Sequence, residues 1–201
     1  MRTFAVMVLV VSSGLFQVVA AQQADFAFGL SSVSSTSAAN AGVDYTPQSV
    51  GGGVFLGFSG DALIRHNFGV QGEINWRSGQ NSYLGVQPFR PIFYDFNAIW
   101  VPKLSKRVSA ELLAGIGAQS ARFYQPFITS CSGFTGTCTN YTSVNHFMGD
   151  VGGGLRLYVT DHFFVRPEAR LYLVRNNVEF SSGKVGRYGV SIGYTFGGAG
   201  Y

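Results

Sequence analysis

The chain has few charged residues and, after its first 21 positions, no long apolar run. Asp, Glu, Lys and Arg make up only 12% of its 201 residues. A transmembrane helix needs about 20 predominantly apolar residues in succession, so the missing run excludes membrane-spanning helices beyond the start of the chain. The formal net charge is +4 and the charges are scattered, so we expect no nucleic-acid partner.

The start of the chain predicts export. A short basic region, Met1-Arg2, precedes an apolar stretch at 4–19 that three polar residues interrupt, and small residues follow at 19–21. We interpret residues 1–21 as a secretory signal peptide and expect one mature domain over residues 22–201. A membrane anchor is the alternative, but the apolar core is short for a span and polar residues divide it.

Cysteine is scarce. The two cysteines, Cys131 and Cys138, both lie in the segment SCSGFTGTCT, and none directly follows the leader, which excludes a lipoprotein-type signal. In an exported chain, two cysteines this close predict a local disulfide. A pair of metal ligands is the alternative, but no His or acid stands nearby in the sequence to complete a site. We therefore expect no metal and no other cofactor.

Glycine and aromatic residues, in contrast, are abundant. The chain contains 27 Gly, 18 Phe, 10 Tyr and two Trp, a composition typical of an all-β protein. From 147 to 159, apolar residues alternate with a polar series that includes Asp150 and Arg156. From 163 to 173 the same alternation sets apolar residues against Arg166, Glu168 and Arg170. A period of two predicts strands, and the two runs form one hairpin around 160–162.

The same alternation predicts eight strands in all. The connections after the second, fourth and sixth strands have about three to six residues, whereas the others run to roughly eight to twenty. Bacterial outer-membrane barrels sort short periplasmic turns from long outer loops in this way, but a soluble Greek-key sandwich has no reason to do so. We predict an all-β, eight-stranded antiparallel up-and-down transmembrane β-barrel. Its strands are expected near 24–31, 52–64, 68–77, 92–100, 108–119, 147–159, 163–173 and 186–196. The longer connections include a polar loop over 77–91 and a loop over 125–145 that holds the two cysteines.

Charged residues concentrate on the polar face of these strands. In a membrane barrel this face points inward, and eight strands enclose a lumen that side chains can just fill. Because an isolated buried charge is very costly, we expect these groups to pair with one another and to give a plugged barrel rather than a pore. The expected lumen network comprises Asp25, Asp61, Glu73, Asp95, Glu111, Asp150 and Glu168 with Arg77, Arg156, Arg166, Arg170 and Arg187.

Two features do not fit the alternation. Pro167 cannot donate to the ladder of a strand with neighbours on both sides, so we expect a bulge there or a position near the periplasmic rim. Arg122 and Lys184 fall at positions of the alternation that face lipid. A charge is tolerated on that face only above the apolar band, so we expect both residues there.

Four segments carry a family resemblance: 68–76, the glycine-rich run 150–158, the run TDHFFVRPEARLY at 160–172, and 188–196. Through them the mature chain resembles the small eight-stranded outer-membrane barrels of Gram-negative bacteria, the OmpA-like and opacity-type family. The resemblance implies an outer-membrane location, contact with membrane lipid and lipopolysaccharide, and a role as envelope anchor, adhesin or ligand-binding surface.

The functional prediction is a non-enzymatic, monomeric envelope protein whose loops bind an unidentified extracellular ligand. A narrow channel or a conduit for small hydrophobic molecules is the first alternative, and it would require an apolar lumen. A lipid A-modifying enzyme is less favoured, because it needs a His and a Ser on the outer face near the extracellular rim. His66 and His162 lie in short turns, and His146, at the correct rim, has no adjacent His-Ser pair. We therefore predict no catalytic residues.

Overall fold

The computed structural model describes residues 23–35, 49–65, 67–83, 85–127, 130–131, 138–177, 179–180 and 183–196. The predicted signal peptide and His66 lie outside these residues. Within the described ranges, no helix is long and apolar enough to cross a membrane.

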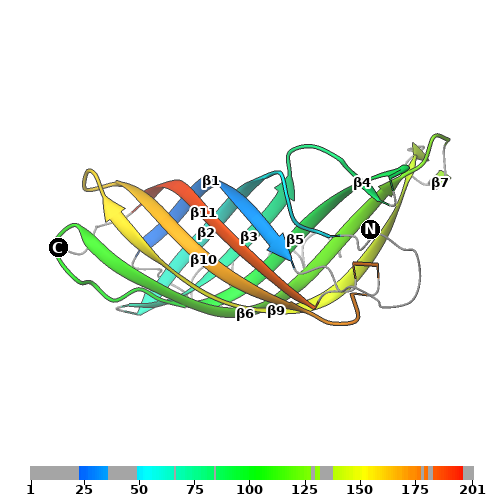
Figure 1. The fold of residues 1–201 in the computed structure, drawn as a ribbon. Coiled ribbons are helices and arrows are strands. Elements are labelled where there is room, and N and C mark those ends of the chain that lie inside the picture. Colours follow the sequence, from blue (N-terminus) through cyan, green and yellow to red (C-terminus); the bar gives the residue numbers. More distant parts are fainter. Residues whose placement is uncertain are drawn as a thin grey trace, which may run out of the picture.

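Eight antiparallel strands close into a barrel, which confirms the predicted fold (Figure 1). Each strand pairs with its neighbours in the chain, and the last strand pairs with the first. The barrel strands are β1 (Gln23–Ser35), β2 (Val54–Arg65), β3 (Phe68–Arg77), β5 (Gln87–Trp100), β6 (Val108–Tyr124), β9 (Tyr141–Tyr158), β10 (Phe163–Val174) and β11 (Lys184–Phe196).

The connections sort as expected. The turns after β2, β5 and β9 are short and lie at one end of the barrel, which we call the short-turn end. The connections after β1, β3, β6 and β10 lie at the opposite end, the long-loop end. Figure 1 shows β6 and β9 continuing toward β4 and β7 at this second end.

Two of the predicted loops are partly strands. The segment expected as a polar loop over 77–91 contains β4 (Asn81–Tyr83), which pairs with the early part of β5. The loop expected over 125–145 contains β7 (Ser130–Cys131), β8 (Cys138–Thr139) and the first residues of β9. These extensions are favoured because inward-facing aromatic rings on them are buried together, although their outward residues are polar.

The outer wall of the barrel is apolar. Outward residues such as Phe96, Ile116 and Ile192 are about 60% exposed, whereas their inward neighbours are mostly buried. Aromatic pairs gather near the short-turn end: Phe68 stacks on Trp100 with centroids 6.2 Å apart. The alternation therefore places the apolar face outside and the charged face inside, as the sequence predicts.

Pro167 interrupts one ladder, and of the two expected alternatives the bulge is absent; the residue is the fifth of β10, counted from the short-turn end. It lies opposite Val190 of β11, but the pairing of β10 with β9 passes from Val165 opposite Leu157 to Glu168 opposite Gly154. The register is the same on both sides of this gap. The missing N–H of proline thus removes ladder bonds while the strand keeps its alignment.

Candidate functional site

In the interior, near the short-turn ends of the strands, one cluster of charges surrounds Arg156, which has no exposed surface. Its guanidinium donates to Asp25, to Asp61 at 2.8 Å and to Glu111 at 2.6 Å. Arg166 pairs with two of these three acids, at 3.1 Å from Asp61 and 3.4 Å from Glu111. The acceptors come from four other strands: Asp25 from β1, Asp61 from β2, Glu111 from β6 and the Ser191 hydroxyl, which accepts from Arg166, from β11.

A second cluster lies beside the first, toward the long-loop end. Arg170 donates to Glu73 and, at 3.2 Å, to Asp95, while Arg187 donates to Glu73 and, at 2.5 Å, to Glu168. Gln71 joins the two clusters, because its Oε1 accepts from Arg170 at 2.7 Å and its Nε2 donates to Glu111 at 3.3 Å. We call the two clusters together the charged layer.

The structure places two predicted members of this network differently from the rest. Arg77, at the end of β3, packs its guanidinium against Gly53 and makes no ion pair with any described residue. Asp150 is buried, but it approaches Arg170 only to 3.9 Å, and neither of its carboxylate oxygens accepts a hydrogen bond. The interior therefore contains seven acids and four arginines, whereas the predicted network included Arg77 as a fifth arginine.

Apolar side chains fill the interior on the long-loop side of the charged layer, a feature that the sequence analysis missed. Phe93 stacks on Tyr172 with ring centroids 5.1 Å apart, and Phe89 packs against Phe123 at 5.9 Å. Phe89 and Phe93 are at odd-numbered positions, as is the inward-facing Asp95, and this alternation could have placed both rings in the interior. This outer apolar layer contains Val33, Val50, Phe55, Phe89, Phe93, Ala121, Phe123, Met148, Tyr172, Val174, Phe180 and Val185.

A smaller apolar group lies at the short-turn end of the interior. It consists of Leu63, Ile99, Val101 and Leu113, all at most 6% exposed. Phe164 is also buried there, with its ring centroid 5.3 Å from the guanidinium carbon of Arg156. Apolar side chains thus lie beside the Arg156 cluster at the short-turn end as well as on the long-loop side of the charged layer.

The connection between β10 and β11 folds over the outer apolar layer. Phe180 is only 1% exposed and contacts Phe89, with centroids 5.2 Å apart. Gln119 donates to Asn177 at 3.3 Å, and Nε2 of His146 lies 2.7 Å from Glu179. His146 is therefore at the long-loop end, as predicted, with a carboxylate as its partner.

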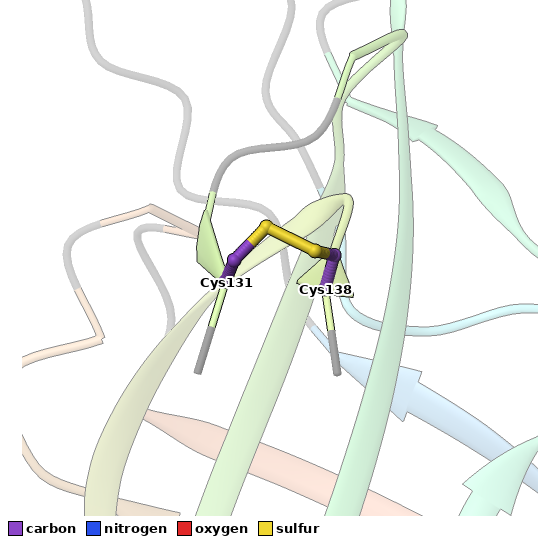
Figure 2. Close-up of a disulfide and its surroundings, with 2 residues drawn as sticks. All are labelled: Cys131 and Cys138. Carbon is purple, nitrogen blue, oxygen red and sulfur yellow. A yellow bond between two sulfur atoms is a disulfide. The ribbon is translucent and has the colours of Figure 1, made fainter. Parts of the chain in front are cut away.

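The predicted disulfide joins Cys131 to Cys138 and thereby links β7 to β8 (Figure 2). Both cysteines are exposed, and the short two-stranded sheet that they staple is separate from the sheet of the barrel. The disulfide thus stabilises a feature of the long-loop end outside the barrel wall.

No family model and no curated protein matches the chain. Among solved structures, it is similar to Ail, the attachment invasion locus protein of Yersinia pestis, with 18% identity and a TM-score of 0.54 over 87% of this chain and 98% of that one. The Ail structure contains the heparin analogue sucrose octasulfate.

Two further outer-membrane structures show the same likeness. Neisserial surface protein A matches with 13% identity and a TM-score of 0.54 over 86% of this chain and 94% of that one. The N-terminal β-barrel domain of Pseudomonas aeruginosa OprF matches with 12% identity and a TM-score of 0.53 over 86% and 97% of the two chains. The chain therefore has the fold of the small eight-stranded outer-membrane β-barrels.

Proposed function

We propose that the chain is a non-enzymatic outer-membrane protein whose barrel is closed to solutes and whose long-loop end is an extracellular interaction surface of the adhesion type. The apolar outer wall supports the membrane location, since exposed residues such as Phe96 and Ile116 would face lipid. The predicted signal peptide and the outer-membrane proteins of the same fold agree with it. The short-turn end then faces the periplasm.

The filling of the interior carries the proposal of a closed barrel. Ion pairs and buried apolar side chains together occupy it, so a continuous water path would have to separate both kinds of contact. Breaking one buried ion pair costs roughly 3 to 5 kcal/mol. An internal cavity beside Arg166 and Glu168 measures about 10 Å³, which is close to the space that one water molecule needs.

Single-channel recording in planar bilayers at neutral pH tests this proposal. We expect silence from the parent protein and brief openings from Glu168→Ala and Arg170→Ala. The first variant removes one of the two carboxylates that pair with Arg187, and the second leaves Asp95 without an arginine. Met148→Leu, a change within the outer apolar layer, is the matched control and should stay silent. A steady, large conductance from the parent would refute the closed barrel.

The interaction role is supported by the structure of the long-loop end. The stapled β7–β8 hairpin and the extended β6–β9 pair reach beyond the barrel and present exposed apolar residues such as Phe127. An exposed apolar residue far from the lipid-facing wall is a candidate contact for a partner. Loss of binding to host cells or matrix after removal of 127–139, with the barrel still folded in detergent, is the expected result; unchanged binding would exclude this hairpin.

The non-enzymatic reading is supported by the surroundings of the histidines in the described part of the chain. His146 pairs with Glu179, and Nδ1 of His162 lies 3.2 Å from the backbone oxygen of Thr195 at the short-turn end. Neither forms a hydrogen bond with a serine among the interactions of the described residues. An assay for deacylation of lipid A by the purified barrel should therefore give no product.

One observation favours a second candidate function, passage of a small hydrophobic molecule through the barrel wall. A shallow, mainly apolar groove lies across β9, β10, β11, β1 and the start of β2. Its lining includes Leu155, Pro167 and Val190, where the β9–β10 ladder is interrupted. Pro167→Val would restore a donor to that ladder. If the parent transfers an apolar dye across liposomes and this variant does not, the second candidate replaces the closed barrel.

A further inference from the structure

Two arginines face each other on the outer wall near the long-loop end. Arg90 of β5 lies directly opposite Arg122 of β6, and both have the outward parity and are partly exposed. Like charges in directly opposed positions of an antiparallel pair are destabilising. The arrangement therefore calls for an anion close to both guanidinium groups.

No described residue supplies that anion. Neither arginine forms an ion pair with a described acid, and Nε of Arg90 is buried without a hydrogen-bond partner. The guanidinium carbon of Arg122 lies 5.0 Å from the ring centroid of Tyr141, a cation–π contact that orients the group but leaves its charge uncompensated. Within the described part of the chain, the pair thus has donors without acceptors and no acid that balances its double positive charge.

The distribution of charge over the long-loop end strengthens this point. Glu179 is the acid that the described residues place there, and it pairs with His146. Of the other described acids, seven face the interior of the barrel and Asp161 lies in a turn at the opposite end. Cations at the long-loop end are more numerous: Arg77, Arg90, Arg122, Arg175 and Lys184.

The position of the two arginines along the barrel axis can be compared with the height of the apolar band. Trp100 marks the aromatic residues of β5 at the short-turn end, and Arg90 lies ten residues away on the same strand. At about 3.4 Å per residue and a tilt of about 40°, this separation corresponds to about 26 Å along the barrel axis. The apolar band of such barrels is about 25 Å tall, so the pair lies at the level of the outer lipid headgroups.

We propose that Arg90 and Arg122 bind a phosphate group on the saccharide headgroup of an outer-leaflet glycolipid. Guanidinium groups match phosphate in geometry and form strong, often bidentate, charge-assisted hydrogen bonds with it. One phosphate between the two side chains would turn their repulsion into a shared attraction. Tyr124 and Tyr141, whose rings are 5.9 Å apart beside Arg122, provide a surface for a neighbouring sugar. This inference rests on the outer-membrane location proposed above, and it adds the binding residues and the chemical group that they contact.

The test is a titration of the folded protein in detergent with bisphosphorylated lipid A, followed by calorimetry. Each substitution, Arg90→Gln or Arg122→Gln, should weaken binding about tenfold, the change expected when one charged hydrogen bond is lost. The double variant should therefore bind about a hundredfold more weakly. The matched control, Lys106→Gln with Arg107→Gln, removes the same charge from the exposed turn at the short-turn end and should bind as the parent does.

Two other ligands separate the possible sources of the phosphate. Dephosphorylated lipid A should bind the parent as weakly as lipid A binds the double variant, and a soluble sulfated oligosaccharide should compete poorly. Equal binding of lipid A by the parent and the double variant, or equal binding of the dephosphorylated lipid, would overturn the site. Tight competition by the soluble oligosaccharide would overturn the lipid as its source.

Thermal unfolding gives an independent readout. Without lipid A, Arg122→Gln should unfold at the same temperature as the parent or higher, because the substitution removes a repulsion. Saturating lipid A should raise the midpoint of the parent more than that of the variant. A lower midpoint of the variant in both conditions would mean that Arg122 is structural. Membrane fractionation tests the location separately, so a failed site and a failed location give different results.

Discussion

The middle of the barrel interior and its long-loop side are filled by different chemistry on the same strands. On β5, Phe93 belongs to the outer apolar layer, and Asp95, the next inward residue, belongs to the charged layer. On β10, Arg170 belongs to the charged layer, and Tyr172, the next inward residue, belongs to the outer apolar layer. Apolar packing accepts other residues of similar volume, whereas a buried ion pair accepts no loss of one partner. The charged layer should therefore tolerate substitution less well than the outer apolar layer.

Loss of a central acid should have the largest effect. Glu111 accepts from Arg156 and Arg166, so Glu111→Ala should lower the free energy of unfolding by about 3 to 5 kcal/mol. The matched substitution in the outer apolar layer, Met148→Leu, should cost less than about 1.5 kcal/mol. Urea unfolding of the barrel in lipid vesicles measures both. Similar costs would mean that the two layers do not differ in tolerance.

A charge on the outer wall should have the next largest effect, because it tests which face of the strand meets lipid. Ile116→Arg or Leu155→Arg should destabilise the barrel by about 2 to 4 kcal/mol. Asn145→Arg, outward on β9 but near the outer interface, should cost at most about 1 kcal/mol. If all three variants refold equally well in vesicles, the apolar wall is not in contact with the bilayer core.

The acids of the charged layer should also differ from one another, because Asp150 accepts no hydrogen bond. Asp150→Asn keeps the size of the side chain and removes one of seven carboxylates that face four arginines. Since no hydrogen bond is lost, the free energy of unfolding should change by less than about 1 kcal/mol, in either direction. A cost as large as that of Glu111→Ala in the same titration would show that Asp150 has a partner.

The disulfide should have the smallest effect on the barrel. Cys131→Ser with Cys138→Ser opens a staple that lies outside both interior layers, so the unfolding midpoint of the barrel should stay within about 0.5 kcal/mol of the parent value. Protease should, in contrast, cleave the 127–140 region faster. Failure of the double variant to fold in bilayers would make the hairpin part of the barrel's folding unit.

The strands and their two faces could be predicted because a period of two is a local property of the sequence. Arg156 and Arg170 could be assigned to the interior from parity alone. Their partners could not be chosen, since the register that places Asp61 near Arg156 depends on the tilt and closure of the whole barrel. Arg77 shares the parity of Glu73 but lies too close to the strand end to reach the acids.

The outer apolar layer was missed for a different reason. Over 77–91, Ser, Gly, Asn and Gln are frequent, and this composition is typical of loops. The structure extends β5 through this region because Phe89 has Phe123 and Phe180 to pack against, two residues distant in the chain. Long-range burial thus overrides the local preference.

Closure of the barrel by β1 and β11 determines when the chain can finish folding. Ala24 pairs with Phe196, so nearly the whole described chain separates the two strands that make the final contact. Contacts this distant in sequence form slowly, and until they form β1 and β11 expose unpaired edges that can join other chains. Such a protein depends on being kept apart from its copies during transit, and a chain shortened before β11 should aggregate rather than form a smaller barrel.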